Sequence, residues 1–125
     1  MTTYTIETPF IRIWMEDHIV HCAFRERSVI DLESARHCTR EKIALLGKKS
    51  HPCLVDLQRI NHLTNEAKEY FEDEGSLYGK AGALVTKSGI STMIGNFFLS
   101  IKNNSVPIKN FTDRRKALEW LEQYL

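Results

Sequence analysis

Residues 51–71, HPCLVDLQRINHLTNEAKEYF, hold the acidic side chains whose types and spacing could do chemistry. Asp56 ends an apolar run, a polar loop spans Gln58 to Leu63, and Glu66 follows just after Thr64. Two carboxylates that flank one loop can act as general acid and general base. The alternative is structural, because an Asp often accepts loop N–H groups and a Glu stabilises the first turn of a helix. We favour the structural role.

A second candidate site is an anion site at Lys87-Ser88-Gly89, where an expected strand meets an expected helix. Free backbone N–H groups at such a junction favour negative charge, and the lysine and serine add contacts. The competing explanation is that Ser88 simply caps the helix and Gly89 permits the turn. The three residues are therefore kept as an alternative, ligand-binding site.

The five histidines and three cysteines suggest metal or thiol chemistry, but their spacing does not support it. No Cys-x-x-Cys or His-x-x-x-His pair occurs, and zinc sites depend on such spacings. Cys53 lies inside an apolar run and is expected to be a small buried side chain. Cys22, Cys38 and Cys53 are odd in number and widely spaced, as unpaired thiols in a reducing compartment would be. We expect no metal and no cofactor.

A third feature is the apolar surplus of Phe97-Phe98-Leu99, beside Met93 and Ile94. Phe98 is expected at the rim of the apolar stripe of its helix and Leu99 outside it. An exposed apolar face of this kind marks a contact with a partner or with a second copy of the chain. The alternative is a wide stripe on a well-buried helix.

Hydrophobic periodicity and turn residues place these candidates on an alternating series of strands and helices. Asp31, Thr64 and Thr112 are the expected helix caps. The inner face of the first helix is expected to hold Leu32, Ala35, Thr39, Ile43 and Leu46. The stripe of the third helix is expected to hold Ile90, Met93, Ile94, Phe97 and Ile101. The expected strands are 10–15, 19–24, 51–57, 81–86 and 106–111, and the expected helices are 31–46, 64–75 or 64–79, 89–102 and 112–125.

This order predicts a single α/β domain over residues 1–125. The hairpin of the first two strands should join a mixed, mostly parallel sheet of about five strands, covered by about four helices. In open sheets of this class, sites gather outside the carboxyl ends of the strands. The loop after Asp56 and the junction at Lys87 both lie at that edge.

Composition and charge indicate which classes of binding partner the protein is expected to have. The chain has 17 basic and 16 acidic residues, interspersed, for a net charge of +1. Nucleic acids and anionic membranes usually require a surface of one sign, so neither is expected as a partner. No apolar run approaches the roughly 20 residues that span a bilayer, and no secretory signal is recognised. The expected location is the cytoplasm.

The strand, loop and helix at Leu54-Val55-Asp56-Leu57, Ile60, Leu63 and Thr64-Asn65-Glu66-Ala67 resemble the STAS family, the fold of anti-sigma-factor antagonists. The coarse order of elements also agrees over nearly the whole chain. The residues from Ala83 to Leu121 look more closely like small bacterial STAS-like proteins of uncharacterised role. That likeness is carried by Ile94-Gly95-Asn96-Phe97-Phe98-Leu99, Pro107, Phe111-Thr112-Asp113 and Ala117-Leu118-Glu119-Trp120-Leu121.

The resemblance implies a cytoplasmic switch or docking module that is not an enzyme. Family members that act as switches carry a serine at the start of the second helix, which a partner kinase phosphorylates. Here Glu66 occupies that position, so the chain either imitates the modified state or has given up switching. The expected partner-binding residues are His62, Thr64, Asn65 and Glu66, with Phe97, Phe98 and Leu99 as a second contact.

The partner is an unidentified protein, and a homodimer through the third helix stays open. The fold also occurs in domains that bind nucleotides or lipids. The alternative function is therefore a binding domain for a small anionic molecule, a nucleotide or a lipid, at Lys87, Ser88 and Gly89.

Overall fold

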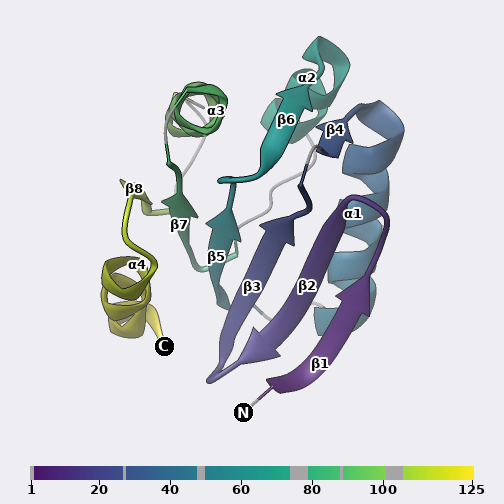
Figure 1. The fold of residues 1–125 in the computed structure, drawn as a ribbon. Helices are drawn as coiled ribbons and strands as arrows, with labels where there is room; N and C mark the ends of the chain where they lie inside the picture. The colour runs from purple at the N-terminus through teal and green to yellow at the C-terminus, as the bar shows by residue number, and fades with distance from the viewer. Residues whose placement is uncertain (1, 27, 48–49, 74–78, 88, 101–105) are drawn as a thin grey trace.

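The computed structural model describes residues 2–26, 28–47, 50–73, 79–87, 89–100 and 106–125, of which 2–4, 72 and 73 are described by backbone alone. Eight strands, four α-helices and a short 3₁₀ helix follow one another along these residues (Figure 1). The order is β1 (Thr2–Glu7), β2 (Ile11–Glu16), β3 (Ile19–Phe24), β4 (Ser28–Ile30), α1 (Leu32–Leu46), β5 (Pro52–Asp56), β6 (Ile60–Leu63), α2 (Asn65–Asp73), β7 (Ala81–Val85), α3 (Ile90–Leu99), β8 (Ile108–Phe111), α4 (Arg114–Leu121) and η1 (Glu122–Tyr124).

Six strands form one mixed sheet in the order β1-β2-β3-β5-β7-β8. The pairs β1–β2 and β2–β3 are antiparallel, whereas β3–β5, β5–β7 and β7–β8 are parallel. The β2–β3 turn consists of Asp17 and His18, which both have positive φ, at 53° and 67°. That conformation matches the right-handed twist of a two-residue hairpin. The predicted α/β class, hairpin and covering helices are confirmed, and the sheet has one strand more than expected.

The sheet is apolar on two faces, and the helices divide unequally between them. The larger core cluster takes Val20, Cys22 and Phe24 from β3 and packs them against buried residues of α1, α2 and α3. The smaller cluster takes Ile19 from β3 together with residues of β5, β7 and α4. Among the described helices, only α4 therefore covers the second face. It packs on β5, β7 and β8, meets β3 at the buried Ile19, and leaves β1, β2 and the rest of β3 without a covering helix on that side (Figure 1).

Three strands were missed by the sequence prediction. The edge strand β1 pairs with β2, and the predicted polar loop contains β6, which pairs in parallel with the three-residue β4. In β6, Ile60 and Leu63 are buried while Asn61 and His62 between them are exposed. Four residues with this spacing show no alternation, because the periodicity of strands becomes recognisable only over longer segments. His62 consequently lies on a strand and not in a loop.

The inner face of α1 is also corrected. Ala35 and Thr39 are buried as predicted, but Cys38 and Lys42 complete the buried face, and Ile43 is 57% exposed. The spacing i, i+3, i+4, i+7 explains the set, and the long aliphatic stem of a lysine can pack beside apolar residues. The Asp31 cap is confirmed, since its carboxylate accepts the Ser34 N–H at 2.8 Å.

The last helix begins one residue later than predicted. Asp113, and not Thr112, is the cap: its carboxylate accepts the N–H groups of Arg115 at 2.8 Å and Lys116 at 3.4 Å. The predicted extensions of α2 through residues 74–78 and of α3 through Ile101 and Lys102 lie outside the described residues.

Replacing the cap gives a first testable prediction. Asp113→Ala should lower the free energy of unfolding by about 1 kcal/mol, because two N–H groups lose their acceptor. Thr112→Ala, the matched control, should change it by less than about 0.5 kcal/mol, as exposed positions away from such features do. Chemical denaturation measures both values. Equal effects of the two substitutions would contradict this assignment of the cap.

Candidate functional site

The start of α2 is fixed by Thr64, which holds this part of the predicted site in place. Its backbone N–H donates to the carbonyl of Ile30, which ties it to the end of β4. Its hydroxyl accepts the Ala67 N–H at 3.2 Å, and its carbonyl accepts the Lys68 N–H at 3.0 Å. The expected cap is therefore confirmed, and the Thr64 hydroxyl is engaged in the structure of the helix.

The polar residues around Thr64 face solvent. His62, Asn65 and Glu66 are all exposed, on the end of β6 and the first turn of α2. A carboxylate in the first turn is stabilised by the positive end of the helix dipole. The predicted polar cluster thus exists as an exposed group on two adjoining elements.

The predicted apolar contact on α3 needs correction, because the helix turns a different side to the core. Phe98 is only 2% exposed and belongs to the larger core, so it is not a surface residue. Its ring contacts that of Phe71 on α2, with centroids 5.5 Å apart. Phe97 is half-buried at the edge of this core, and Leu99 is exposed as predicted.

Close packing at Gly95 accounts for this orientation. A side-chain carbon at Gly95 would come within 2.9 Å of the Thr86 side chain at the end of β7. The buried residues of α3 are accordingly Ser91, Ile94, Gly95 and Phe98. Ile90 and Met93, predicted inside, lie outside, and Met93 is 72% exposed. A glycine that marks the contact side of a helix gives no signal to a search for apolar stripes.

The two predicted contact regions lie on neighbouring elements. Strand β6 packs against α3, and the Lys68 ammonium on α2 lies 5.7 Å from the centre of the Phe97 ring. We call the exposed and half-buried residues of this region the α2–α3 seam: His62, Asn65, Glu66, Lys68 and Phe97. A polar cluster beside a half-buried aromatic ring is a composition typical of protein contact surfaces.

Of the three residues of the alternative, ligand-binding site, the structure describes two, Lys87 and Gly89. Lys87 is exposed, and its backbone N–H donates to the Ser91 hydroxyl at 2.9 Å. Gly89 has a φ of 57° and precedes α3, so its expected role in permitting the turn is confirmed. Ser88 lies outside the described residues. The Lys87 side chain lines a hollow at the edge of the sheet, together with Asp56.

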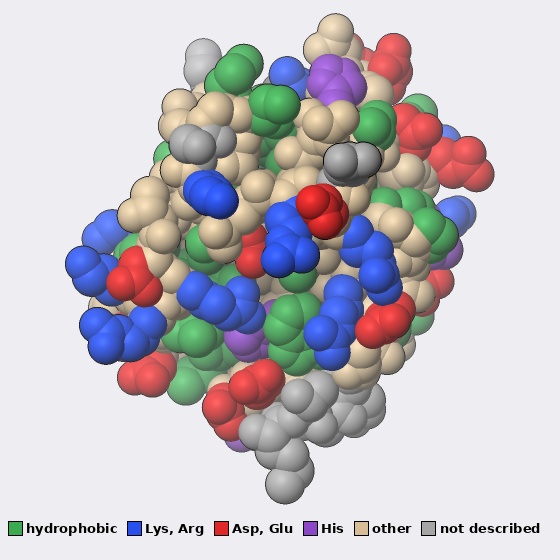
Figure 2. All heavy atoms as spheres, in the orientation of Figure 1, with side chains coloured by type: hydrophobic (Ala, Val, Ile, Leu, Met, Phe, Trp, Pro, Cys, Tyr) green, Lys and Arg blue, Asp and Glu red, His purple; other side chains and the backbone are tan. Residues whose placement is uncertain are grey.

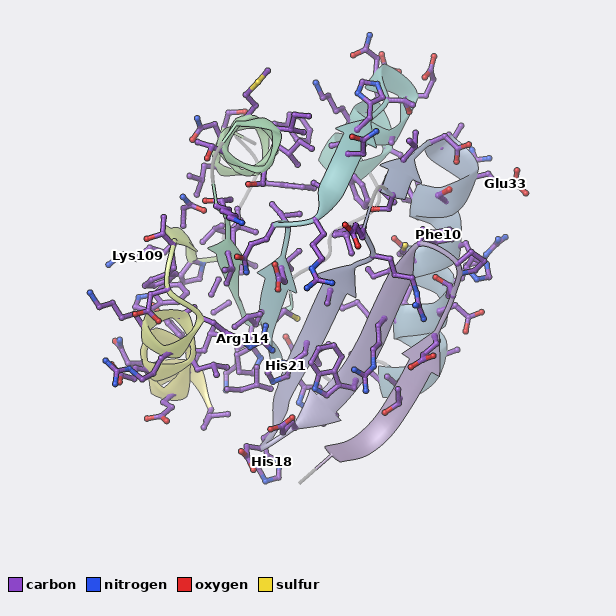
Figure 3. The ribbon with its side chains drawn as sticks, viewed as in Figure 1. Phe10, His18, His21, Glu33, Lys109 and Arg114 are labelled. Atoms are coloured by element: carbon purple, nitrogen blue, oxygen red, sulfur yellow. The ribbon has the colours of Figure 1, made fainter. Side chains whose placement is uncertain are left out.

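A polar stack on the uncovered face of the sheet was not predicted. His21 on β3 and Trp14 on β2 are register partners, and their rings stack with centroids 4.9 Å apart. Figure 3 labels His21 and the neighbouring Arg114. Arg114, at the start of α4, donates from Nη2 to Nδ1 of His21 at 2.7 Å. Its Nη1 lies 3.6 Å from the Asp56 carboxylate. The other carboxylate oxygen of Asp56 accepts the Gln58 N–H at 3.0 Å. Both oxygens therefore have structural partners, as the favoured interpretation of Asp56 expects.

This surrounding keeps His21 neutral. Burial, and to a lesser extent the positive charge of Arg114, lower the pKa of His21 from 6.5 to about 4, against the opposite effect of Glu16 and Asp17. The Arg114 bond requires Nδ1 to accept, so the ring proton of the neutral form lies on Nε2. The sequence could not show this contact, since the two residues are 93 positions apart.

The predicted absence of a metal site and of a reactive thiol can be compared with the His, Cys, Asp and Glu side chains of the described residues. Within the described ranges, no group of three or more His, Cys, Asp or Glu side chains is placed to hold a metal ion. Cys22, Cys38 and Cys53 are buried free thiols, and burial raises the pKa of Cys22 and of Cys38 to about 12. Those two are protonated at neutral pH, whereas a nucleophile requires the thiolate. In the part of the chain with assigned structure, none of the helices combines the length and apolar composition needed to cross a bilayer.

Sequence comparison decides the family. The family model described as "Domain of unknown function (DUF7793)" matches residues 13–125. The chain belongs to the DUF7793 family. No curated protein is significantly similar to this chain in sequence.

Two solved structures share the fold of this DUF7793 member. One is an uncharacterised DUF3478 protein with a SpoIIAA-like fold from Shewanella loihica, at a TM-score of 0.57 and 20% identity, covering 89% of this chain and 91% of that one. Another is an anti-sigma factor antagonist from Mycobacterium paratuberculosis, at a TM-score of 0.59 and 17% identity, covering 94% and 99%. The predicted STAS-like fold is confirmed.

The His21 site gives a second testable prediction. In the unfolded chain His21 takes up a proton near pH 6.5, whereas in the native protein it does so only near pH 4. Because the unfolded state then binds more protons than the native state, the free energy of unfolding should fall as the pH drops from 6.5 to 4. His21→Gln removes this group and should flatten the dependence over that interval. Denaturant midpoints measured at several pH values compare the two proteins. Parallel pH profiles for wild type and variant would show that His21 does not cause the dependence.

Proposed function

We propose that this protein is a regulatory protein-interaction module of the cytoplasm, without catalytic activity of its own. The observation that carries the proposal is the α2–α3 seam, where exposed His62, Asn65 and Glu66 adjoin the half-buried Phe97. Support comes from the fold, which this chain shares with an anti-sigma factor antagonist. The buried, protonated thiols Cys22 and Cys38 are unsuited to act as nucleophiles, in keeping with a role that is not catalytic.

Glu66 would supply the negative charge that switching members of the STAS family acquire at a serine. In this chain the charge is permanent, lies in the first turn of α2 and is exposed to solvent. A partner with a cationic patch would meet this carboxylate without prior phosphorylation. Charged groups at the rim of an interface contribute mainly to the choice of partner and to the association rate.

The partner is proposed to be a different protein. A second copy of the chain is the alternative occupant, for which the exposed Met93 and Leu99 on α3 would be the contacts. Analytical ultracentrifugation of the isolated protein separates these cases. If the protein dimerises with increasing concentration and Met93→Lys abolishes the dimer, a second copy of the chain occupies this surface and the proposal of a different protein partner is wrong.

The test of the proposed function is a charge reversal at the start of α2. Glu66→Lys should weaken the complex with the protein partner by about tenfold or more, because a favourable charge becomes an opposing one. Glu33→Lys is the matched control, since Glu33 is also an exposed acid in the first turn of a helix, on α1 (Figure 3). Both substitutions oppose a helix dipole and should cost a similar 0.3–1 kcal/mol or so of stability.

The measurement is quantitative recovery of the partner on tagged wild-type, Glu66→Lys and Glu33→Lys protein, followed by titration of the purified components. The expected result is loss of the complex with Glu66→Lys and full retention with Glu33→Lys. Equal affinity for all three proteins would remove the start of α2 from the binding surface and overturn the proposal.

A further inference from the structure

A hollow of about 790 Å³ lies on the uncovered side of the sheet, apart from the α2–α3 seam. Its wall includes Arg12 on β2 and Arg25, Arg59 and Lys87 in segments that follow strands. Figure 2 views this face and shows Lys and Arg side chains gathered across its middle. Ligand sites for small molecules typically enclose about 300–1,000 Å³, so the hollow has the size of a site and not of a packing defect.

The cations share one topological position. Three neighbouring parallel strands, β3, β5 and β7, each have a cationic residue shortly after the carboxyl end: Arg25 after Phe24, Arg59 after Asp56 and Lys87 after Val85. All three line the same hollow. The space outside the carboxyl ends of parallel strands is where open α/β sheets bind their ligands. Three cations converge there from segments that are distant in sequence.

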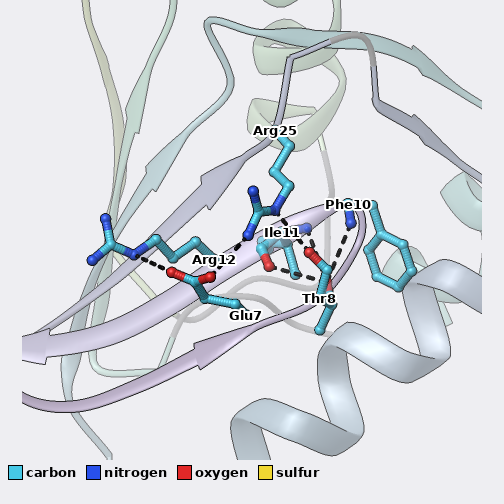
Figure 4. Close-up of polar contacts among 6 residues, drawn as sticks. All are labelled: Glu7, Thr8, Phe10, Ile11, Arg12 and Arg25. Carbon is cyan, nitrogen blue, oxygen red and sulfur yellow. Dashed lines mark hydrogen bonds and ion pairs between the residues drawn. The ribbon is translucent and has the colours of Figure 1, made fainter.

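Two of the cations are held in place by the protein. Glu7 lies 3.4 Å from Nε of Arg12 and 3.3 Å from Nη2 of Arg25, so one carboxylate is shared by two guanidinium groups (Figure 4). Nε of Arg25 also donates to the carbonyl of Thr8 at 2.8 Å. A planar guanidinium fixed on one side keeps its remaining N–H groups oriented for an incoming anion.

The other two cations carry uncompensated charge. Within the described residues, no ion pair or side-chain hydrogen bond is found for Arg59 or Lys87. The acidic residues of the wall are Glu7, Glu26 and Asp56, and Asp56 is already paired with Arg114. Counting Arg114, five cations face three carboxylates, which leaves a surplus of two positive charges in a chain whose net charge is only +1.

We propose that this hollow binds a small molecule that carries two or more linked phosphate groups, such as a nucleoside diphosphate. Arginine recognises phosphate oxygens in a bidentate manner, and lysine adds a point charge. The volume exceeds what a single phosphate fills, and two free cations beside two oriented ones match a ligand of more than one phosphate. The site uses neither Ser88 nor the start of α2, so it does not depend on the proposed docking function.

The test uses isothermal titration calorimetry with inorganic pyrophosphate and, separately, with ADP, on the full chain at low ionic strength. The double variant Arg59→Gln/Lys87→Gln removes the two unpaired cations, which are both exposed. The control variant Arg115→Gln/Lys116→Gln removes the same charge from exposed positions on α4 that do not line the hollow. Thermal unfolding verifies that all proteins are folded.

The expected result is binding of pyrophosphate to wild type, a loss of at least about tenfold in affinity for Arg59→Gln/Lys87→Gln, and less than about twofold for the control. Tighter binding of ADP than of pyrophosphate would support the proposal and identify a contribution of the nucleoside. Absence of binding of both probes to wild type would overturn it. An equal loss in the two double variants would also overturn it, because general attraction to a cationic protein would then explain the binding.

Discussion

The two-sided burial of the central strands is the constraint on which the rest of the structure depends. Alternate residues of β3 and β5 enter two different cores, so the sheet requires cover on both faces. The connections β3 to β5, β5 to β7 and β7 to β8 all advance in one direction, and right-handed crossovers then place α1, α2 and α3 on the same face. One helix of eight residues, α4, remains for the other face.

This unequal division explains why the molecule offers two separate surfaces. On the fully covered side, α2 and α3 pack through Phe71 and Phe98, and this packing brings the exposed start of α2 beside Phe97. On the other side, α4 packs on β5, β7 and β8. Strands β2 and β3 carry Arg12, Trp14 and His21 on this side, in place of the apolar residues that a covering helix would require. Arg114 at the start of α4 joins its helix to this polar stack and to Asp56.

Sequence patterns predicted the features that depend on local chemistry. The hairpin, the buried strand ending in Asp56 and the caps Asp31 and Thr64 all follow from residue types at short spacing. The patterns failed where a contact between residues distant in sequence determines which side chain is buried or which strand forms. Phe98 is in the core because Gly95 lets α3 approach Thr86, and β6 exists because β4 pairs with it. The shared position of Arg25, Arg59 and Lys87 likewise appears only once the strand order is known.

The measurement that tests the central claim most directly is hydrogen–deuterium exchange of backbone amides, compared between the free protein and its complex with the partner. Docking at the α2–α3 seam predicts slower exchange from Ile60 to Lys68 and along α3 in the complex, with unchanged exchange in β1, β2 and α4. Protection confined to α4 or to the uncovered face of β1–β3 would contradict the claim and move the interface to the other side of the sheet.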